Sequence, residues 1–82
     1  MNASEVRSLI EAGLPGAQVR VLSDDDTHFE ATIIAPQFEG KRMIQRHQLV
    51  YGTLGILMGR EIHALTMQVH APSELSAQPS DG

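Results

Sequence analysis

The order of the structural elements is decided by residues 28–69, which read HFEATIIAPQFEGKRMIQRHQLVYGTLGILMGREIHALTMQV. Residues 28–35 alternate between apolar and polar side chains, which predicts a strand with one face in water. Residues 43–58 carry apolar side chains three and four positions apart, which predicts an amphipathic helix. Residues 62–69 return to a period of two. Because a strand–helix–strand connection is nearly always right-handed, we expect these two strands to lie parallel in one sheet.

The helix over residues 43–58 is expected to bend. Gly52 and Gly55 each cost about 1 kcal/mol relative to alanine inside a helix. We therefore predict a break near Tyr51 and Gly52 that divides the helix into two pieces. The predicted apolar stripe consists of Met43, His47, Val50, Leu54, Leu57 and Met58. Because His47 lies in this apolar stripe, we predict that it is a core histidine whose ring hydrogen-bonds a backbone group.

The residues before this stretch predict a helix and a hairpin. Asn2 to Glu5 fits a capping box, which predicts a helix over residues 3–12. Residues 17–22 alternate as a strand, and the three aspartates at 24–26 suit a turn. We expect residues 17–22 to pair with residues 28–35 in a hairpin.

The whole pattern predicts one α+β domain over residues 1–75. With 82 residues, 41% of them hydrophobic and 20% charged, the chain has room for one modest core. We expect the order αββαβ(α), with a three-stranded mixed sheet and helices packed on one face. Residues 71–75 fit one helical turn with proline at its first position. Residues 76–82 are small and polar, which predicts a disordered tail.

The composition excludes several classes of function. The chain has no cysteine, which excludes disulfides, a cysteine nucleophile, and a zinc or iron–sulfur site held by its own thiolates. No GxSxG, HExxH or P-loop spacing occurs, so self-contained catalysis is not expected. The first residues lack the basic and apolar regions of a signal peptide, and the apolar stretch from Leu49 to Met58 is too short to span a bilayer. We therefore expect a cytoplasmic protein that is not an enzyme and does not enter a membrane.

The charge of the chain is unevenly distributed. The net charge is −4, but four of the six basic residues lie between positions 41 and 60, where there is no Asp or Glu. These four are Lys41, Arg42, Arg46 and Arg60. A cationic segment on an acidic protein indicates a partner-binding surface, although a solvated helix face has the same composition. A nucleic-acid-reading set within this segment would be Arg42, Gln45, Arg46 and Gln48, but four cations contribute little binding energy at physiological salt.

Histidines are the candidate metal ligands, and there are four: His28, His47, His63 and His70. None is paired at the spacing that puts two imidazoles on one helix face. His63 begins a predicted strand directly after the loop at 59–61, where an imidazole can be half-buried yet reachable. His28 begins its own strand, so the two histidines share one edge of the sheet if these strands are parallel neighbours. His70 is on the polar face of its strand and is expected to face solvent.

Several motifs resemble the BolA family, in order, over about Val6 to Leu75. They are Thr27-His28-Phe29, Phe38-Glu39-Gly40-Lys41, Gln45 to Tyr51 with Leu54, Ile62-His63-Ala64-Leu65, and Ala71-Pro72-Ser73-Glu74-Leu75. Two departures matter. Leu75 stands where the family usually has tryptophan. The aspartates at 24–26 occupy the loop in which many members carry a cysteine or a histidine.

The resemblance implies a fold similar to type II KH domains, with helix-turn-helix-like central helices. It also implies an adaptor or regulator in iron–sulfur assembly that binds a monothiol glutaredoxin. In such complexes a 2Fe–2S cluster is shared: glutaredoxin and glutathione supply thiolates, and the histidine that matches His63 supplies the ligand from the BolA-like side. The isolated chain would then hold no cluster. His28 is the candidate second metal ligand, because the oxygen of an aspartate is a poor substitute for thiolate or imidazole at such a cluster.

One alternative function stays open at this point. The chain would instead be a DNA- or RNA-binding transcriptional regulator that uses the basic residues 41–60, and the two functions do not exclude each other. A weak homodimer is a further candidate assembly.

Overall fold

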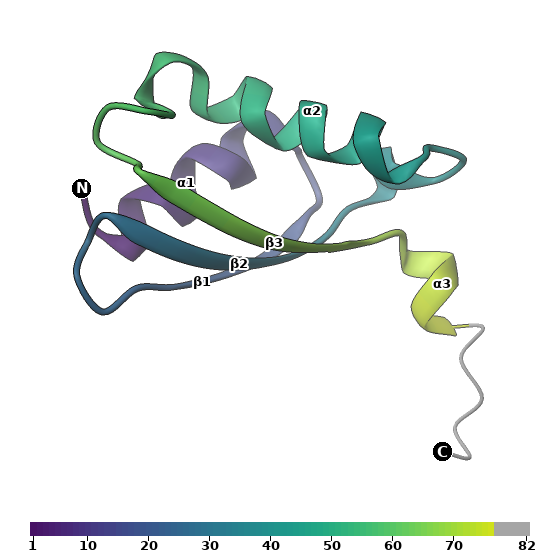
Figure 1. Ribbon diagram of the computed structural model, residues 1–82. Coiled ribbons are helices and arrows are strands. Elements are labelled where there is room, and N and C mark those ends of the chain that lie inside the picture. The colour runs from purple at the N-terminus through teal and green to yellow at the C-terminus, as the bar shows by residue number, and fades with distance from the viewer. Residues whose placement is uncertain (77–82) are drawn as a thin grey trace.

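A three-stranded sheet carries the fold of the computed structural model, which describes residues 1–76 (Figure 1). Its strands are β1 (Gln18–Leu22), β2 (His28–Ile34) and β3 (Ala64–His70), in the order β1-β2-β3. β1 pairs with β2 in antiparallel orientation, and β2 pairs with β3 in parallel. The predicted mixed sheet and its parallel strand–helix–strand unit are confirmed.

The two long helices flank the strands on one side, and shorter helices lie in the connections and after β3. In residues 1–76 they are α1 (Ala3–Gly13), η1 (Pro36–Phe38), α2 (Met43–Leu54), η2 (Gly55–Leu57) and α3 (Pro72–Ser76). α1 and α2 cover the same face of the sheet, as predicted, whereas α3 lies beyond the end of β3 (Figure 1). Ser76, which was expected to begin the tail, is the last residue of α3. The rest of the predicted tail, residues 77–82, lies outside the described residues.

The core lies between the sheet and the two long helices. Its buried side chains come from every layer: Val6 and Ile10 from α1, Phe29 and Ile33 from β2, and Val50 from α2. Each such side chain stabilises the fold by about 1.5–3 kcal/mol relative to its exposed state. β2 alternates between exposed and buried residues from its first position, so its predicted core face is confirmed. Every helix within residues 1–76 is too short or too polar to cross a bilayer.

The N-terminus of α1 is capped as the sequence predicted. The backbone N–H of Glu5 donates to Asn2 Oδ1 (2.9 Å), and the backbone N–H of Asn2 donates to Glu5 Oε1 (2.8 Å). These bonds satisfy donors that a helix start otherwise leaves unpaired. The helix extends to Gly13, where a Cβ atom would lie 2.4 Å from Thr53 Cγ2. Glycine at this position therefore allows α1 and α2 to pack closely.

α2 ends later than the sequence predicted. The expected break at Tyr51 and Gly52 is wrong, because both residues lie inside a helix that continues to Leu54. Gly55 follows with φ 58° and ψ −132°, a conformation that residues with a side chain avoid, and it begins η2. The helix therefore ends at the second glycine, where the backbone turns in a way that requires glycine.

The buried stripe of α2 is also rotated from the predicted one. Its buried residues are Arg46, Val50 and Leu54, which follow one another at intervals of four and so share a face. Met43, which was expected in the stripe, is 55% exposed. His47 is half-buried, but no backbone group within residues 1–76 hydrogen-bonds its ring. Its expected hydrogen bond is therefore not part of the described structure.

Candidate functional site

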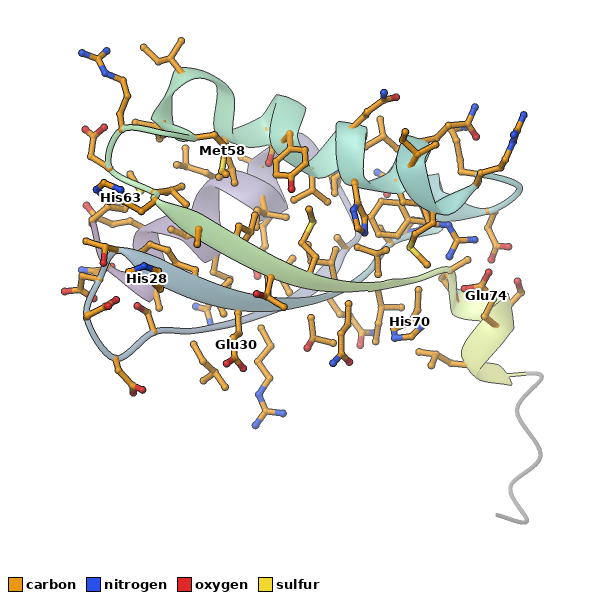
Figure 2. The ribbon with its side chains drawn as sticks, viewed as in Figure 1. His28, Glu30, Met58, His63, His70 and Glu74 are labelled. Carbon is orange, nitrogen blue, oxygen red and sulfur yellow. The ribbon has the colours of Figure 1, made fainter. Side chains whose placement is uncertain are left out.

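Two histidines meet at one end of the sheet. The parallel register places His28 opposite Ala64, so the residue before β3, His63, lies beside the start of β2. The backbone N–H of His63 donates to the carbonyl oxygen of Thr27 (2.9 Å). The two imidazole rings are 6.4 Å apart between centroids, with an angle of 28° between their planes (Figure 2). The prediction that both histidines share one edge of the sheet is confirmed.

Both rings are accessible at this edge. The side chain of His28 is 65% exposed. His63 is also exposed, whereas the sequence predicted a half-buried ring there. β3 begins two residues later than predicted, at Ala64 instead of Ile62, so the side chain of His63 is not held in the pleat of the strand. His70 lies at the opposite end of β3 (Figure 2) and is half-buried instead of facing solvent fully.

Asp25 contacts His28 directly. Its Oδ2 atom accepts a hydrogen bond from His28 Nδ1 (2.7 Å), and its Oδ1 atom accepts the backbone N–H groups of Thr27 (3.0 Å) and His28 (2.9 Å). These hydrogen bonds hold the pKa of Asp25 well below its usual range, and the bond from the backbone N–H of His28 has the largest effect. The sequence assigned the three aspartates only to a turn, and nothing in their spacing distinguishes Asp25 from its neighbours.

Two imidazoles are a suitable but incomplete ligand set. Imidazole nitrogen binds iron, zinc and copper, and it replaces thiolates on one iron of Rieske-type 2Fe–2S clusters. No group of three or more His, Asp or Glu side chains within residues 1–76 is arranged to hold a metal ion. The remaining ligands of a four-coordinate metal at this edge would therefore come from another molecule.

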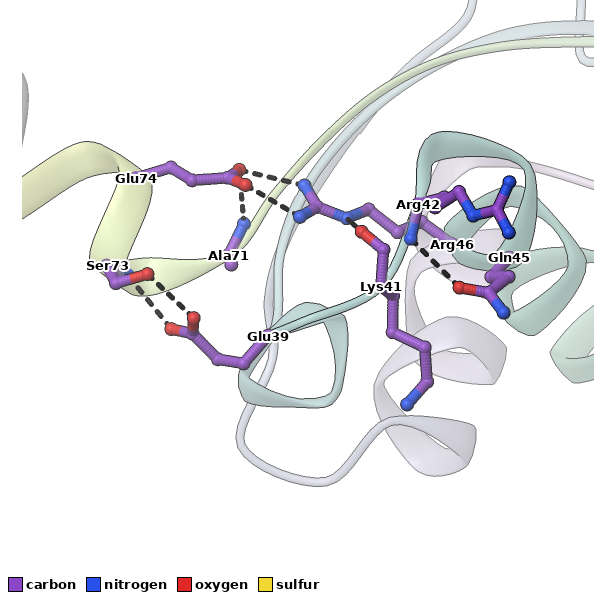
Figure 3. A network of polar contacts seen from close by, with 8 residues as sticks. All are labelled: Glu39, Lys41, Arg42, Gln45, Arg46, Ala71, Ser73 and Glu74. Carbon is purple, nitrogen blue, oxygen red and sulfur yellow. Dashed lines mark hydrogen bonds and ion pairs between the residues drawn. The ribbon is translucent and has the colours of Figure 1, made fainter.

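Arg46 does not belong to an exposed basic surface, which corrects the sequence prediction for both partner and nucleic-acid binding. Its side chain is 8% exposed and forms two bonds to Glu74, from Nη1 to Oε1 (2.8 Å) and from Nη2 to Oε2 (2.6 Å). Its Nε–H donates to the carbonyl oxygen of Lys41 (2.9 Å) (Figure 3). Its guanidinium lies 5.9 Å from the centre of the Phe38 ring. The helical spacing that turns Val50 towards the core turns Arg46 the same way.

A second carboxylate completes this network at α3. Glu39 accepts hydrogen bonds from the backbone N–H (3.0 Å) and the hydroxyl (2.6 Å) of Ser73, while Glu74 also accepts the backbone N–H of Ala71 (3.0 Å) (Figure 3). The pKa of Glu74 is lowered to about 2, and the hydrogen bonds from Arg46 are the largest cause of this shift. Proline followed two positions later by glutamate is typical of a helix start, but no sequence signal pairs this glutamate with Arg46.

The other cations are exposed but lie at two ends of α2. Lys41 and Arg42 precede the helix, and Arg60 follows η2 in the turn that leads to His63. α2 has 12 residues, so at 1.5 Å per residue these ends are roughly 18 Å apart (Figure 1). Of the predicted partner-binding residues, Arg60 alone lies in the segment next to the histidine pair. The expected continuous basic surface is therefore divided.

The predicted nucleic-acid set is likewise only partly available. Arg42 and Gln48 are exposed. The side-chain oxygen of Gln45 accepts the backbone N–H of Arg42 (2.9 Å), and this bond caps the start of α2 instead of leaving that oxygen free. With Arg46 buried, the side chains of Arg42 and Gln48 and the amide nitrogen of Gln45 remain available to contact a base.

Known proteins share this architecture. The family model described as BolA-like protein matches residues 8–74. The structure of a bolA protein homologue from Coxiella burnetii is 36% identical, covers 93% of this chain and 97% of its own, and has a TM-score of 0.81. The BolA domain of SufE1 from Arabidopsis thaliana is 29% identical, covers 88% of this chain and 93% of its own, and has a TM-score of 0.72.

Curated relatives extend the comparison. The DNA-binding transcriptional regulator BolA of Haemophilus influenzae is 36% identical over 53 residues, which are 65% of this chain and 52% of that protein. The chain spans 38% of the chloroplast protein BOLA1 of Arabidopsis thaliana and 36% of human BolA-like protein 1. Because the family model covers most of the chain and the solved folds superimpose along nearly all of it, this chain belongs to the BolA-like protein family.

Proposed function

We propose that this BolA-like chain is a non-enzymatic adaptor that completes a 2Fe–2S cluster shared with a monothiol glutaredoxin and glutathione. The single observation that carries the proposal is the exposed pair of His28 and His63, with ring centroids 6.4 Å apart. The absence of cysteine supports it, because such a chain contributes to an iron–sulfur cluster only by adding imidazole to the thiolates of other molecules. The likeness to the BolA domain of SufE1 supports a place in iron–sulfur biochemistry.

The chain's own residues have distinct roles in this proposal. His63 is the principal ligand, and the bond from its backbone N–H to Thr27 fixes its Cα position against β2. Arg60, three residues before it, offers a cation to the carboxylates of glutathione or of the partner. When bound, the cluster supplies a one-electron redox centre, and its potential rises when imidazole replaces thiolate.

The proposal is tested by reconstitution. The chain is mixed with a monothiol glutaredoxin, glutathione, iron and sulfide, and the visible absorption and circular dichroism spectra are recorded. The wild-type mixture is expected to differ from the glutaredoxin homodimer, and His63→Ala is expected to restore the homodimer spectrum. His70→Ala, which removes a histidine at the far end of β3 from His63, is the matched control. Identical spectra for wild type and His63→Ala would refute the ligand role.

A second candidate function is binding to nucleic acid, and one relative favours it. The similar Haemophilus influenzae protein is named a DNA-binding transcriptional regulator. Lys41 and Arg42, just before α2, and Gln48, in its first half, are exposed. Fluorescence anisotropy with labelled duplex and single-stranded probes across a salt series measures this binding. Arg42→Ala is expected to weaken it and to reduce the salt slope by about 1, whereas Arg20→Ala, an exposed cation on β1, is the control. Absence of binding at low salt would eliminate this function.

A further inference from the structure

The turn before β2 is built around one carboxylate. Besides its contacts with His28, Asp25 accepts the backbone N–H of Thr27 and so closes the turn. Ser23 fastens the other side, because its hydroxyl donates to the carbonyl oxygen of His28 (2.7 Å) and accepts the backbone N–H of Asp26 (3.0 Å). Asp26 has φ 60°, a conformation that aspartate adopts more readily than most residues. The backbone of the turn therefore fixes the position of the Asp25 carboxylate relative to the ring of His28.

The contact between Asp25 and His28 decides which ring nitrogen is free. An ionised carboxylate only accepts hydrogen bonds, so His28 Nδ1, at 2.7 Å, carries the proton that it donates. In the neutral ring the lone pair then resides on Nε2. The Thr27 hydroxyl lies 3.0 Å from the same Nδ1 atom, so both polar neighbours engage Nδ1. No hydrogen bond within residues 1–76 fixes the ring of His63 in the same way.

We propose that Asp25 is a positioning residue that holds His28 in its Nδ1–H form and presents Nε2 beside His63, which makes His28 the second cluster ligand of this chain. This inference rests on the proposed function, and it gives the carboxylate of Asp25 a role beyond closing the turn. Metal-bound histidines commonly donate their other N–H to a carboxylate, which orients the ring and raises its basicity. Asp25 would act on the cluster only through His28.

The three aspartates of the turn provide a matched control. Asp24, Asp25 and Asp26 carry the same charge in the same turn. Of these three aspartates, Asp25 alone hydrogen-bonds the ring of His28 in the described structure. Net charge alone would give equal effects on replacing any of them, whereas the geometry predicts an effect for Asp25→Asn and none for Asp24→Asn.

The first measurement uses the full chain alone. Nitrogen-15 chemical shifts of the His28 ring, recorded where the ring is neutral, report which nitrogen is protonated. Wild type and Asp24→Asn are expected to show a protonated Nδ1. In Asp25→Asn the new amide N–H donates to Nδ1, so the proton is expected on Nε2. An unchanged tautomer in Asp25→Asn would overturn the proposal whatever the chain does with a cluster.

The second measurement uses the reconstituted complex with glutaredoxin and glutathione. Asp25→Asn is expected to accelerate cluster loss about 10- to 100-fold, and pulsed EPR of the reduced cluster is expected to lose the nitrogen coupling of a labelled His28. Asp24→Asn should change neither. If Asp25→Asn behaves as wild type while His63→Ala loses the complex spectrum, the function stands and the role of Asp25 fails. If His63→Ala also has no effect, the function fails and the cluster role of Asp25 fails with it.

Discussion

At the scale of single residues, Arg46 is a charged side chain placed inside the fold. Each of its three guanidinium nitrogens has an acceptor: the carbonyl oxygen of Lys41 and the two carboxylate oxygens of Glu74. A buried guanidinium costs free energy unless its donors are paired. The two-pronged bond to Glu74 also depends on the planar geometry of arginine. Arg46 therefore stabilises the attachment of α3 rather than contacting a partner.

Arg46→Ala is expected to lower the free energy of unfolding by about 2–3 kcal/mol, because it removes charge-assisted hydrogen bonds. Arg46→Lys should recover only part of this loss, since lysine cannot form the two parallel bonds. Urea unfolding measures both, with the exposed Arg42→Ala, expected to change stability by less than about 0.5 kcal/mol, as control. Equal losses for Arg42→Ala and Arg46→Ala would contradict the role of Arg46.

The lowered pKa of Glu74 predicts a dependence of stability on pH. A carboxyl group whose pKa falls on folding stabilises the protein above its unfolded pKa and loses this contribution as the pH falls. For Glu74 that window runs from its ordinary value of 4.5 down to about 2. Glu74→Gln should be less stable than wild type near pH 7, and the difference should shrink as the pH falls through this window. Unfolding curves between pH 7 and pH 2 measure it, and a constant difference would argue against the ion pair.

At the scale of elements, two glycines of the central helical region have opposite roles. Gly52 lies inside α2, is exposed, and has no atom within 4 Å of the point that a Cβ would occupy. Gly55 also has open space around it, but its φ of 58° belongs to the left-handed region. Space alone would permit a methyl group at both positions. The backbone conformation permits it only at Gly52.

The matched pair Gly52→Ala and Gly55→Ala tests this distinction. Gly52→Ala is expected to raise the free energy of unfolding by about 0.5–1 kcal/mol, because alanine loses less conformational entropy in a helix. Gly55→Ala is expected to lower it by about 1–3 kcal/mol through backbone strain. Thermal unfolding monitored by circular dichroism measures both changes. Stabilisation by Gly55→Ala would mean that the helix continues past Leu54.

At the scale of the whole molecule, α2 separates two chemically different ends. One end holds the histidine pair and Arg60, and the other holds Lys41, Arg42 and the attachment of α3. A cluster partner at the first end and a nucleic acid at the second would therefore bind to separate surfaces. This separation makes the two candidate functions experimentally distinguishable.

Charge reversal at each end tests the separation. Arg60→Glu is expected to slow association with the glutaredoxin–glutathione partner on the order of 10-fold at low salt, because it opposes electrostatic steering. The effect should fade at high salt. Arg42→Glu should leave that rate unchanged and should instead weaken any binding to nucleic acid. Stopped-flow association rates across a salt series measure this, and equal effects from both variants would indicate one continuous surface.

The three strands, the main helices, their order and the pairing of the strands could be predicted from the sequence, but the end of α2 and the short helices η1 and η2 could not. Period two in residues 28–35 and 62–69 and the helical spacing between them are local properties. A helix between two strands of one sheet is the usual connection of parallel strands. That pairing was enough to bring His28 and His63 to one edge of the sheet. The motifs from Thr27 to Glu74 were enough to indicate the family.

Whether a polar side chain is exposed for binding or engaged inside the protein depends, by contrast, on the three-dimensional fold. Arg46 and Glu74 are 28 positions apart, and only the path of β3 brings them into contact. Asp25 differs from its neighbouring aspartates through the backbone of one turn, which no periodicity describes. Spacing reports which residues share a face, whereas burial and hydrogen bonds depend on what the rest of the chain places against that face. For that reason the position of His63 beside His28 was predictable from the sequence, and the contact of Asp25 with His28 was not.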